Sequence, residues 1–128
     1  ARRLITGDYT PLLQSGEAFA AECYALMQSR CYRPKAIVEY DRKAFIAKEN
    51  KIRVTFDSRI VATESSFDLF DERLNMTPVL DPGAVVMEVK YNGFLLDYIR
   101  RMINTVDQSE LSVSKYMLAR QNGYRYRL

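Results

Sequence analysis

The sequence contains no histidine and no tryptophan, and it has only two cysteines, Cys23 and Cys31, among 128 residues. The absence of histidine removes the usual general base, most Ser or Cys catalytic triads and most zinc sites. The two cysteines do not have metal-ligand spacing, and they predict a reduced, cytoplasmic protein in which neither thiol is catalytic. Any chemistry must therefore depend on carboxylates, Lys, Arg, Tyr and a hard metal ion.

Long hydrophobic runs and a strong net charge are also missing. No apolar run approaches the roughly 18–20 residues that span a bilayer, so we expect no membrane span in this chain. The start, Ala-Arg-Arg-Leu, has no initiator Met and no signal-peptide core, which predicts a processed chain or a piece of a longer protein. A net charge of +3 is too small to argue for a nucleic-acid partner. The length predicts at most one domain, over residues 1–128.

Helical periodicity occurs in three stretches. Apolar residues recur at helical spacing from Glu17 to about Arg30 and again from Phe94 to Val106. A last helix is expected from a cap at Ser112 or Ser114 through about Gln121, where Asn122-Gly123 should end it. Thr10-Pro11 predicts an N-cap followed by proline in the first helical turn. We expect the first long helix to lie on the apolar side of a sheet.

A pair of strands dominates the middle of the chain. From Val38 to Asp57, residues alternate with period two around a polar reversal at 48–51. A third strand, 85–91, has the same design, and 59–64 predicts a further short strand. The residues of the ionic faces are Val38, Tyr40, Arg42 and Ala44, then Lys51, Arg53, Thr55 and Asp57, then Val86, Glu88 and Lys90.

The remaining segments carry weaker signals. Residues 65–78 are interpreted as an irregular crossing with one helical turn, and Asp81-Pro82-Gly83 as a turn before the third strand. The tail, 124–128, is either a final strand or a frayed end. Its alternating Tyr and Arg residues leave nucleic-acid binding as a weak alternative, without a recognised motif.

Two interpretations fit the alternating strands. An antiparallel sheet with one solvated face explains them simply. In the alternative, the sheet curls with its charges inward and helices cover its apolar outer face. The fold class predicted from either is α+β.

Several cations are candidates for binding phosphate. Arg binds phosphate oxygens with two parallel hydrogen bonds, and Lys acts as a point charge, so cations gathered on one concave face imply an anionic ligand. Glu88 is the candidate Mg²⁺ or Mn²⁺ ligand, because hard cations take carboxylate and phosphate oxygens together. The cationic candidates are Arg42, Arg53, Lys90 and Lys115, with Lys43 and Lys51 as secondary members and Tyr40 as a hydrogen-bond donor.

Each candidate also has a structural alternative. Arg42 and Arg53 would pair across strands with Asp57 or Glu39, an arrangement worth little at a surface. Glu88 would form an exposed pair with Lys90. Spacing alone does not decide between ion pairs and a phosphate site.

Four ordered motifs resemble the VTC domain, the catalytic domain of the vacuolar transporter chaperone polyphosphate polymerase, which has many bacterial relatives. The domain belongs to the triphosphate tunnel metalloenzymes of the CYTH-like superfamily. The motifs are Y-D-R-K-A-F (40–45), I-R-V-T-F-D (52–57), M-E-V-K-Y (87–91) and S-K-Y (114–116), preceded by Gly7-Asp8-Tyr9 and Pro11-Leu12-Leu13.

The resemblance implies a tunnel of antiparallel strands lined by Arg and Lys. The activity it implies is a transferase reaction on ATP, triphosphate or inorganic polyphosphate, either synthesis of polyphosphate or its hydrolytic reverse. Carried over by motif, the catalytic residues are Arg42, Arg53 and Lys115, joined in phosphate binding by Tyr40 and Lys90, while Glu88 holds Mn²⁺ or Mg²⁺. Such chemistry needs positioning and charge neutralisation rather than a covalent intermediate.

The resemblance covers only the C-terminal half of such a domain. The basic strands of the first half have no counterpart, so residues 1–128 predict a partial VTC domain forming about half of the tunnel. We expect the chain to be a piece of the full tunnel, to form a homodimer, or to be a non-catalytic polyphosphate-binding or assembly module. Another tunnel activity, a triphosphatase or nucleotide cyclase, is a further alternative.

Overall fold

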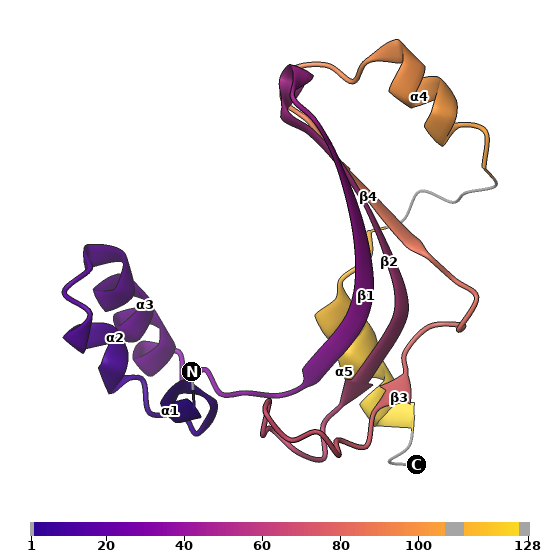
Figure 1. The fold of residues 1–128 in the computed structure, drawn as a ribbon. Coiled ribbons are helices and arrows are strands. Elements are labelled where there is room, and N and C mark those ends of the chain that lie inside the picture. The colour runs from indigo at the N-terminus through magenta and orange to yellow at the C-terminus, as the bar shows by residue number, and fades with distance from the viewer. Residues whose placement is uncertain (1, 107–111, 126–128) are drawn as a thin grey trace. The chain divides into compact units, whose positions relative to one another are not determined.

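The computed structural model describes residues 2–106 and 112–125 and confirms a mixed α+β fold. The chain forms two compact units, each discussed separately below (Figure 1). The helical unit consists of Ala1–Ile37 and Thr63–Asn75. The sheet unit consists of Val38–Ala62 and Met76–Leu128. The residues of the ionic faces all lie in the sheet unit.

The helical unit begins with three helices: α1 (Arg2–Ile5), α2 (Thr10–Gln14) and α3 (Ala18–Ser29). Helices α2 and α3 pack against each other. Tyr9 is buried in this unit, and its hydroxyl donates a 2.6 Å hydrogen bond to the carbonyl of Tyr32. Residues Thr63–Asn75 complete the unit, where the guanidinium of Arg2 lies 5.4 Å from the ring centroid of Phe70. Because α3 belongs to this unit, its predicted place on the apolar side of the sheet stays a prediction.

The start of α2 differs by one residue from the prediction. Tyr9 occupies the N-cap position without a side-chain cap, and Thr10 is the first helical residue. The Thr10 hydroxyl is instead 2.6 Å from Asp8 Oδ1, and that carboxylate also accepts a bond from the Thr10 backbone N–H. Asp8 thus bonds the backbone N–H at the start of the helix in place of the expected threonine cap.

The sheet unit is built around one long strand. Strand β2 (Ile52–Thr63) has β1 (Ile37–Ala47) on one edge, and β3 (Thr77–Pro78) and β4 (Val86–Lys90) pair antiparallel with it on the other. The predicted strand pair and third strand are therefore confirmed. A short 3₁₀ turn over Glu49–Lys51 makes the predicted reversal.

One strand replaces the two that the sequence predicted over 52–64. Arg59 has a φ of 51°, an uncommon backbone conformation for a residue other than glycine, and it lies between the segments that pair with β4 and β3. Its guanidinium pairs with Asp41 of β1. The prediction of a separate strand at 59–64 is wrong. The kink at Arg59 changes the pairing partner of β2 without ending the strand.

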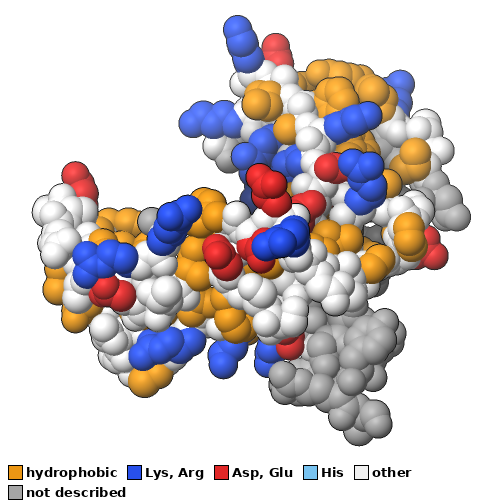
Figure 2. Space-filling model, turned by 60° about the horizontal axis from the view of Figure 1, so that its bottom comes forward, with side chains coloured by type: hydrophobic (Ala, Val, Ile, Leu, Met, Phe, Trp, Pro, Cys, Tyr) orange, Lys and Arg blue, Asp and Glu red, His pale blue; other side chains and the backbone are white. Residues whose placement is uncertain are grey.

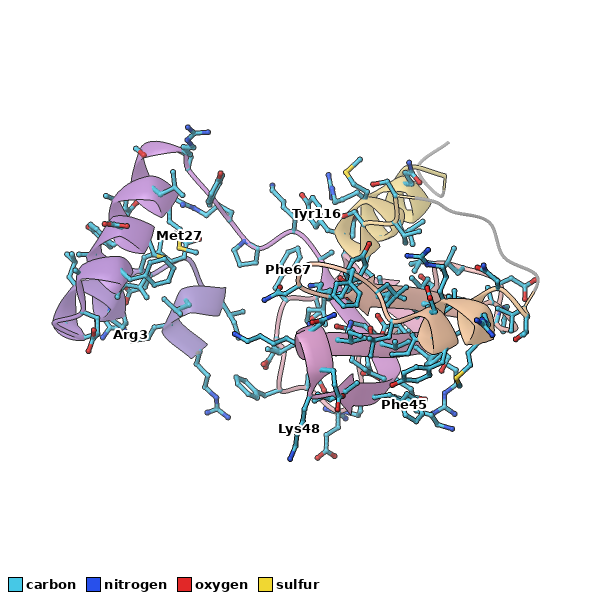
Figure 3. All side chains as sticks on the ribbon, turned by 90° about the horizontal axis from the view of Figure 1, so that it is seen from above. Arg3, Met27, Phe45, Lys48, Phe67 and Tyr116 are labelled. Atoms are coloured by element: carbon cyan, nitrogen blue, oxygen red, sulfur yellow. The ribbon has the colours of Figure 1, made fainter. Side chains whose placement is uncertain are left out.

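The two faces of the sheet differ as the alternation predicted. Phe45 and Phe56 meet edge to face at 5.9 Å on the apolar face, where Phe56 also lies opposite Met87. On the other face, termed the ionic face, Arg42 pairs with Asp57. Phe45 and Tyr116, a residue of α5, lie on opposite sides of the sheet (Figure 3).

Both C-terminal helices differ from their predicted bounds. Helix α4 covers Asp97–Ile103 rather than 94–106, because Leu96 is extended and the Phe94 carbonyl accepts a bond from the Asn50 side chain. Helix α5 covers Lys115–Arg125, so it runs through the predicted stop at 122–123. A glycine near a helix end costs only about 1 kcal/mol, which the rest of the helix can offset.

Helix α5 also corrects the predicted placement of the helices. Lys115 at its first turn reaches the buried carboxylate of Asp57, so this helix contacts the ionic face and not the outer apolar face. The cap at Ser114 is present, since its Oγ accepts a 3.3 Å bond from the Met117 N–H. The alternative cap at Ser112 is not used. Residues 126–128 of the predicted tail lie outside the described residues.

The four strands form an open sheet, so the predicted half of a tunnel is not confirmed. Hydrophobic side chains reach the surface among charged ones, as Figure 2 shows for one face, and Phe45 and Ile46 of β1 are 60% and 75% exposed.

Among the described residues, no helix has both the length and the apolar character needed to cross a bilayer.

Candidate functional site

The centre of the ionic face is a buried carboxylate held by two cations. Asp57 has no exposed surface, and its two oxygens accept bonds of 2.6 and 2.7 Å from Nε and Nη2 of Arg42. Nζ of Lys115 lies 2.6 Å from Oδ2 of the same carboxylate. Strand β1, strand β2 and helix α5 therefore meet at one point through their charged groups.

An aromatic ring supports the same two cations. The Arg42 guanidinium lies 5.1 Å from the Tyr40 ring centroid, and Nζ of Lys115 lies 4.8 Å from it. Cations attracted to an aromatic face gain stability without losing their charge. We call Tyr40, Arg42, Asp57 and Lys115 the aspartate cluster.

The pKa values of Asp57 and Arg42 are shifted in the directions expected for a tight ion pair. Hydrogen bonds from Arg42, reinforced by Lys115, lower the pKa of Asp57 from 3.8 to about 2, although burial opposes the shift. The bond to Asp57 raises the pKa of Arg42. The Asp57 carboxylate is consequently ionised at neutral pH, as its two hydrogen bonds from Arg42 require.

Glu88 lies beside the cluster on the neighbouring strand. Its carboxylate is 3.0 Å from Nζ of Lys90, and the two side chains are 40% and 58% exposed. The bond from Lys90 lowers the pKa of Glu88, and the charges of Lys90, Arg42 and Lys115 act in the same direction. Glu88 is thus an ionised carboxylate surrounded by cations.

Thr55 is the residue directly across the strands from Glu88. Thr55 is 1% exposed, and its Oγ1 has no hydrogen-bond partner among the described residues. A buried hydroxyl without a partner is costly, and a bound water or ligand commonly relieves that cost. Thr55 therefore presents an unpartnered hydroxyl at the strand position opposite Glu88.

The residues fit a magnesium-type ion only in a limited way. Within residues 2–106 and 112–125, no group of three or more His, Cys, Asp or Glu side chains is placed to hold a metal. Mg²⁺, however, is often bound by one or two carboxylates together with substrate phosphates and water. Glu88 satisfies that requirement, whereas Asp57 is already engaged by Arg42 and Lys115.

Arg53 lies further along the ionic face. It is opposite Lys90 in the register of β2 and β4, and both line a cavity at the hairpin end of the sheet. Lys51 lines the same cavity. Lys43, the other secondary cation, lies on the opposite face of β1. Successive residues of a strand point to opposite faces, so Lys43 shares its face with Phe45 and not with Arg42.

The main predicted site residues of the sheet thus share one face, in two groups joined by the Glu88–Lys90 pair, whereas the secondary candidate Lys43 lies on the other face. The structural alternatives are also present in part, since Arg42 does pair with Asp57 and Glu88 with Lys90. The first pair is not a surface pair, because Asp57 is fully buried. Arg53 has no such pair with Glu39.

Two residues of the site were not among the predicted ones. Asp57 appeared only as a possible surface partner, and Thr55 only as a member of an alternating face. The signal for Asp57 was its position as the single acidic residue on the ionic side of β2, among Lys51 and Arg53. No sequence signal distinguishes Thr55 from an ordinary strand threonine.

The arrangement can hold an oxyanion but offers little for covalent catalysis. Its cations are fixed by the sheet and by α5, and a phosphate chain could share them with Asp57. The sheet unit contains no cysteine, and the sequence contains no histidine. Charge neutralisation and positioning are the contributions that these side chains can make.

Comparison with protein-family models matches residues 1–123 to one described as VTC domain. No curated protein and no solved structure gives a significant match. The match covers nearly the whole chain, including both groups of the ionic face.

Proposed function

Since this chain belongs to the VTC domain family, we propose that its ionic face binds triphosphate or inorganic polyphosphate and takes part in metal-dependent phosphoryl transfer. The transfer would convert ATP into polyphosphate, or run in the hydrolytic reverse direction. The proposal assigns catalysis to a complete tunnel, of which the sheet unit supplies one part.

The observation that carries the proposal is the meeting of Arg42 and Lys115 at Asp57. Two cations from distant parts of the chain are held within hydrogen-bonding distance of one carboxylate. A carboxylate in this position resembles a phosphate in charge and in its ability to accept bonds from both groups. The cluster therefore supports an anion site at the donors of Arg42 and Lys115.

The chain's own residues would act by holding and neutralising phosphate oxygens. Arg42 and Lys115 would share their N–H donors between Asp57 and the ligand, while Tyr40 keeps both cations over its ring. Arg53 and Lys90 would meet the chain at the next position along the face. Preorganised cations stabilise the charge of a transferring phosphoryl group without a covalent step.

Glu88 would hold Mn²⁺ or Mg²⁺, with the Thr55 hydroxyl beside it. The ion would supply neutralisation of phosphate charge when bound. For this, Lys90 must release the Glu88 carboxylate, which is feasible because both side chains are exposed enough to turn toward water.

The test is calorimetric titration of tripolyphosphate, with and without Mn²⁺, at low and high salt. Arg42→Ala, Arg53→Ala and Lys115→Ala should each weaken binding about 10-fold or more, since each removes charged donors. Lys43→Ala is the matched control, because it removes a cation from the other face of β1. Unchanged affinity in all three variants, or an equal loss in the control, would sink the assignment.

A second candidate is a non-catalytic polyphosphate-binding module. It is favoured by the engagement of Asp57 with two cations, which leaves Glu88, itself paired with Lys90, as the remaining carboxylate among the described strand residues of the ionic face. The two candidates separate by turnover: release of phosphate from ATP or tripolyphosphate in the presence of Mn²⁺ indicates catalysis. Binding without turnover indicates the module.

A further inference from the structure

The sequence contains two Asn-Gly dipeptides, and the structure places them in different surroundings. Asn92-Gly93 lies in a bend that follows β4, outside any helix or strand. Asn122-Gly123 lies inside helix α5. The same pair of residues is therefore present once in an open connection and once in regular secondary structure.

An Asn-Gly dipeptide can modify itself, because glycine has no side chain to obstruct the reaction. The glycine backbone nitrogen gives its proton to hydroxide and bonds to the side-chain carbonyl carbon of asparagine. The bond from that carbon to the amide nitrogen breaks, and this nitrogen takes a proton from water and leaves as ammonia. One water then adds across either C–N bond of the cyclic imide, which gives aspartate or isoaspartate. Hydroxide and water are the only co-reactants.

The bend after β4 leaves this reaction unobstructed. Asn92 is exposed, and Gly93 has a φ of 79°, which glycine adopts without strain. Apart from its chain neighbours, no heavy atom lies within 4 Å of the position that a Cβ would occupy at Gly93. Within the described part of the chain, the Gly93 N–H makes no backbone hydrogen bond. The attacking nitrogen is thus open to hydroxide, and the imide ring has space to form.

Helix α5 opposes the same reaction at Asn122. In an α-helix each backbone N–H is donated to the carbonyl four residues earlier, so removing the proton from the Gly123 nitrogen breaks a hydrogen bond. Ring formation also requires the helical backbone to unwind locally. Both requirements add to the barrier, and neither applies to Asn92.

The products would change the hairpin end of the sheet unit. The backbone N–H of Asn92 donates a 2.8 Å bond to the Asn50 carbonyl, and the Asn50 side chain donates a 2.9 Å bond to the Phe94 carbonyl. Isoaspartate inserts one methylene into the backbone between these two bonded points. Either product places one negative charge two residues beyond Lys90.

We propose that Asn92 is a site of spontaneous modification in the folded protein, where it is converted to aspartate and isoaspartate, and that α5 protects Asn122. This inference goes beyond the proposed function and does not depend on it.

The experiment follows both sites in one sample. Folded wild-type protein is kept in mildly alkaline buffer, and samples taken over time are cut with trypsin and analysed by mass spectrometry. Cleavage after Lys and Arg separates the sites into the peptides Tyr91–Arg100 and Gln121–Arg125. Each conversion replaces an amide NH₂ with a hydroxyl, which changes the peptide mass. A protein isoaspartate methyltransferase measures the isoaspartate separately.

The expected result is a difference between the sites that depends on the fold. In the folded protein, Asn92 should react roughly 5- to 30-fold faster than Asn122. In concentrated urea the two rates should be similar, because α5 is then unfolded. Asn75 provides the baseline, since it is exposed but precedes Met76 instead of glycine.

Three results would overturn the inference. The first is an equal rate at the two Asn-Gly sites of the folded protein, or a faster rate at Asn122. The second is a rate at Asn92 no higher than that at Asn75. The third is a difference between Asn92 and Asn122 that persists unchanged in urea, because the neighbouring sequence and not α5 would then be its cause.

Discussion

Replacing Asp57 with asparagine should destabilise the sheet unit strongly, and the effect should depend on pH. The folded-state pKa of Asp57 is about 2 against an ordinary value of 3.8. At about 1.36 kcal/mol per unit, this difference corresponds to about 2 kcal/mol of stability at neutral pH. Asparagine also directs an amide N–H₂ group toward cations, so part of its hydrogen bonding is lost.

The stability lost in Asp57→Asn is limited by how far Arg42 and Lys115 can reach water. Removing one member of a fully buried ion pair costs about 3–5 kcal/mol, because the other charge is left without solvent or a partner. Arg42 and Lys115 are 34% and 21% exposed, so they can turn toward water. We therefore expect Asp57→Asn to lower the free energy of unfolding by about 2–4 kcal/mol at pH 7.

The sign of the pH dependence follows from the lowered pKa. The contribution of Asp57 is fully present above pH 5 or so and is lost as the pH falls through 3.8 toward 2. This contribution is measured by urea unfolding of the wild-type protein and of Asp57→Asn at several pH values. The effects of all other carboxylates cancel when the two free energies of unfolding are subtracted. The difference should shrink by about 2 kcal/mol on acidification.

Asp41→Asn provides the control for this measurement. Asp41 pairs with Arg59 on the same sheet, but the two side chains are 55% and 76% exposed. Exposed pairs contribute about 0–1 kcal/mol, so this variant should differ little from wild type. Two results would refute the reasoning. The first is a difference in unfolding free energy between wild type and Asp57→Asn that stays constant down to pH 2, and the second is a difference no larger than the effect of Asp41→Asn.

Three further outcomes are expected. Glu88→Gln should reduce the Mn²⁺ dependence of tripolyphosphate binding more than it reduces metal-free binding, and calorimetry showing equal metal dependence in both proteins would contradict its role as a ligand. Ser114→Ala should cost about 1 kcal/mol of unfolding free energy by removing the cap bond to Met117, while Ser114→Asp should restore it; equal urea midpoints for all three proteins would argue against the cap. Tyr9→Phe should cost only about 1 kcal/mol, because the Tyr32 carbonyl still accepts a 2.6 Å bond from Arg33, and a much larger loss in urea unfolding would show that the hydroxyl has another function.

The strands and their faces could be predicted because both depend on local alternation. Period-two patterning placed Arg42, Arg53 and Glu88 on the same side, and the structure agrees. The helix bounds were less predictable, since distant contacts decide them. Asn50 of the hairpin holds the Phe94 carbonyl and delays α4, an interaction that no window of neighbouring residues reveals.

The burial of Asp57 could not be predicted for a similar reason. Its carboxylate is covered because Lys115 arrives from a helix far along the chain, and neither residue has a pattern that names the other. The kink at Arg59 is also invisible in sequence, because a positive φ at arginine is rare and has no compositional signal. The sequence therefore offered Asp57 as a cross-strand partner of Arg42, but it gave neither the burial of that carboxylate nor its contact with Lys115.

The discontinuity of the helical unit has a practical consequence for anyone dividing this chain. A cut after Ile37 appears to be a clean boundary, because β1 begins there and three helices precede it. The excised remainder would nevertheless carry Thr63–Asn75, a stretch that belongs with the discarded helices and whose Phe70 would lose the guanidinium of Arg2. A minimal version of the sheet unit thus needs an internal replacement of that stretch by a short linker, not a terminal deletion alone.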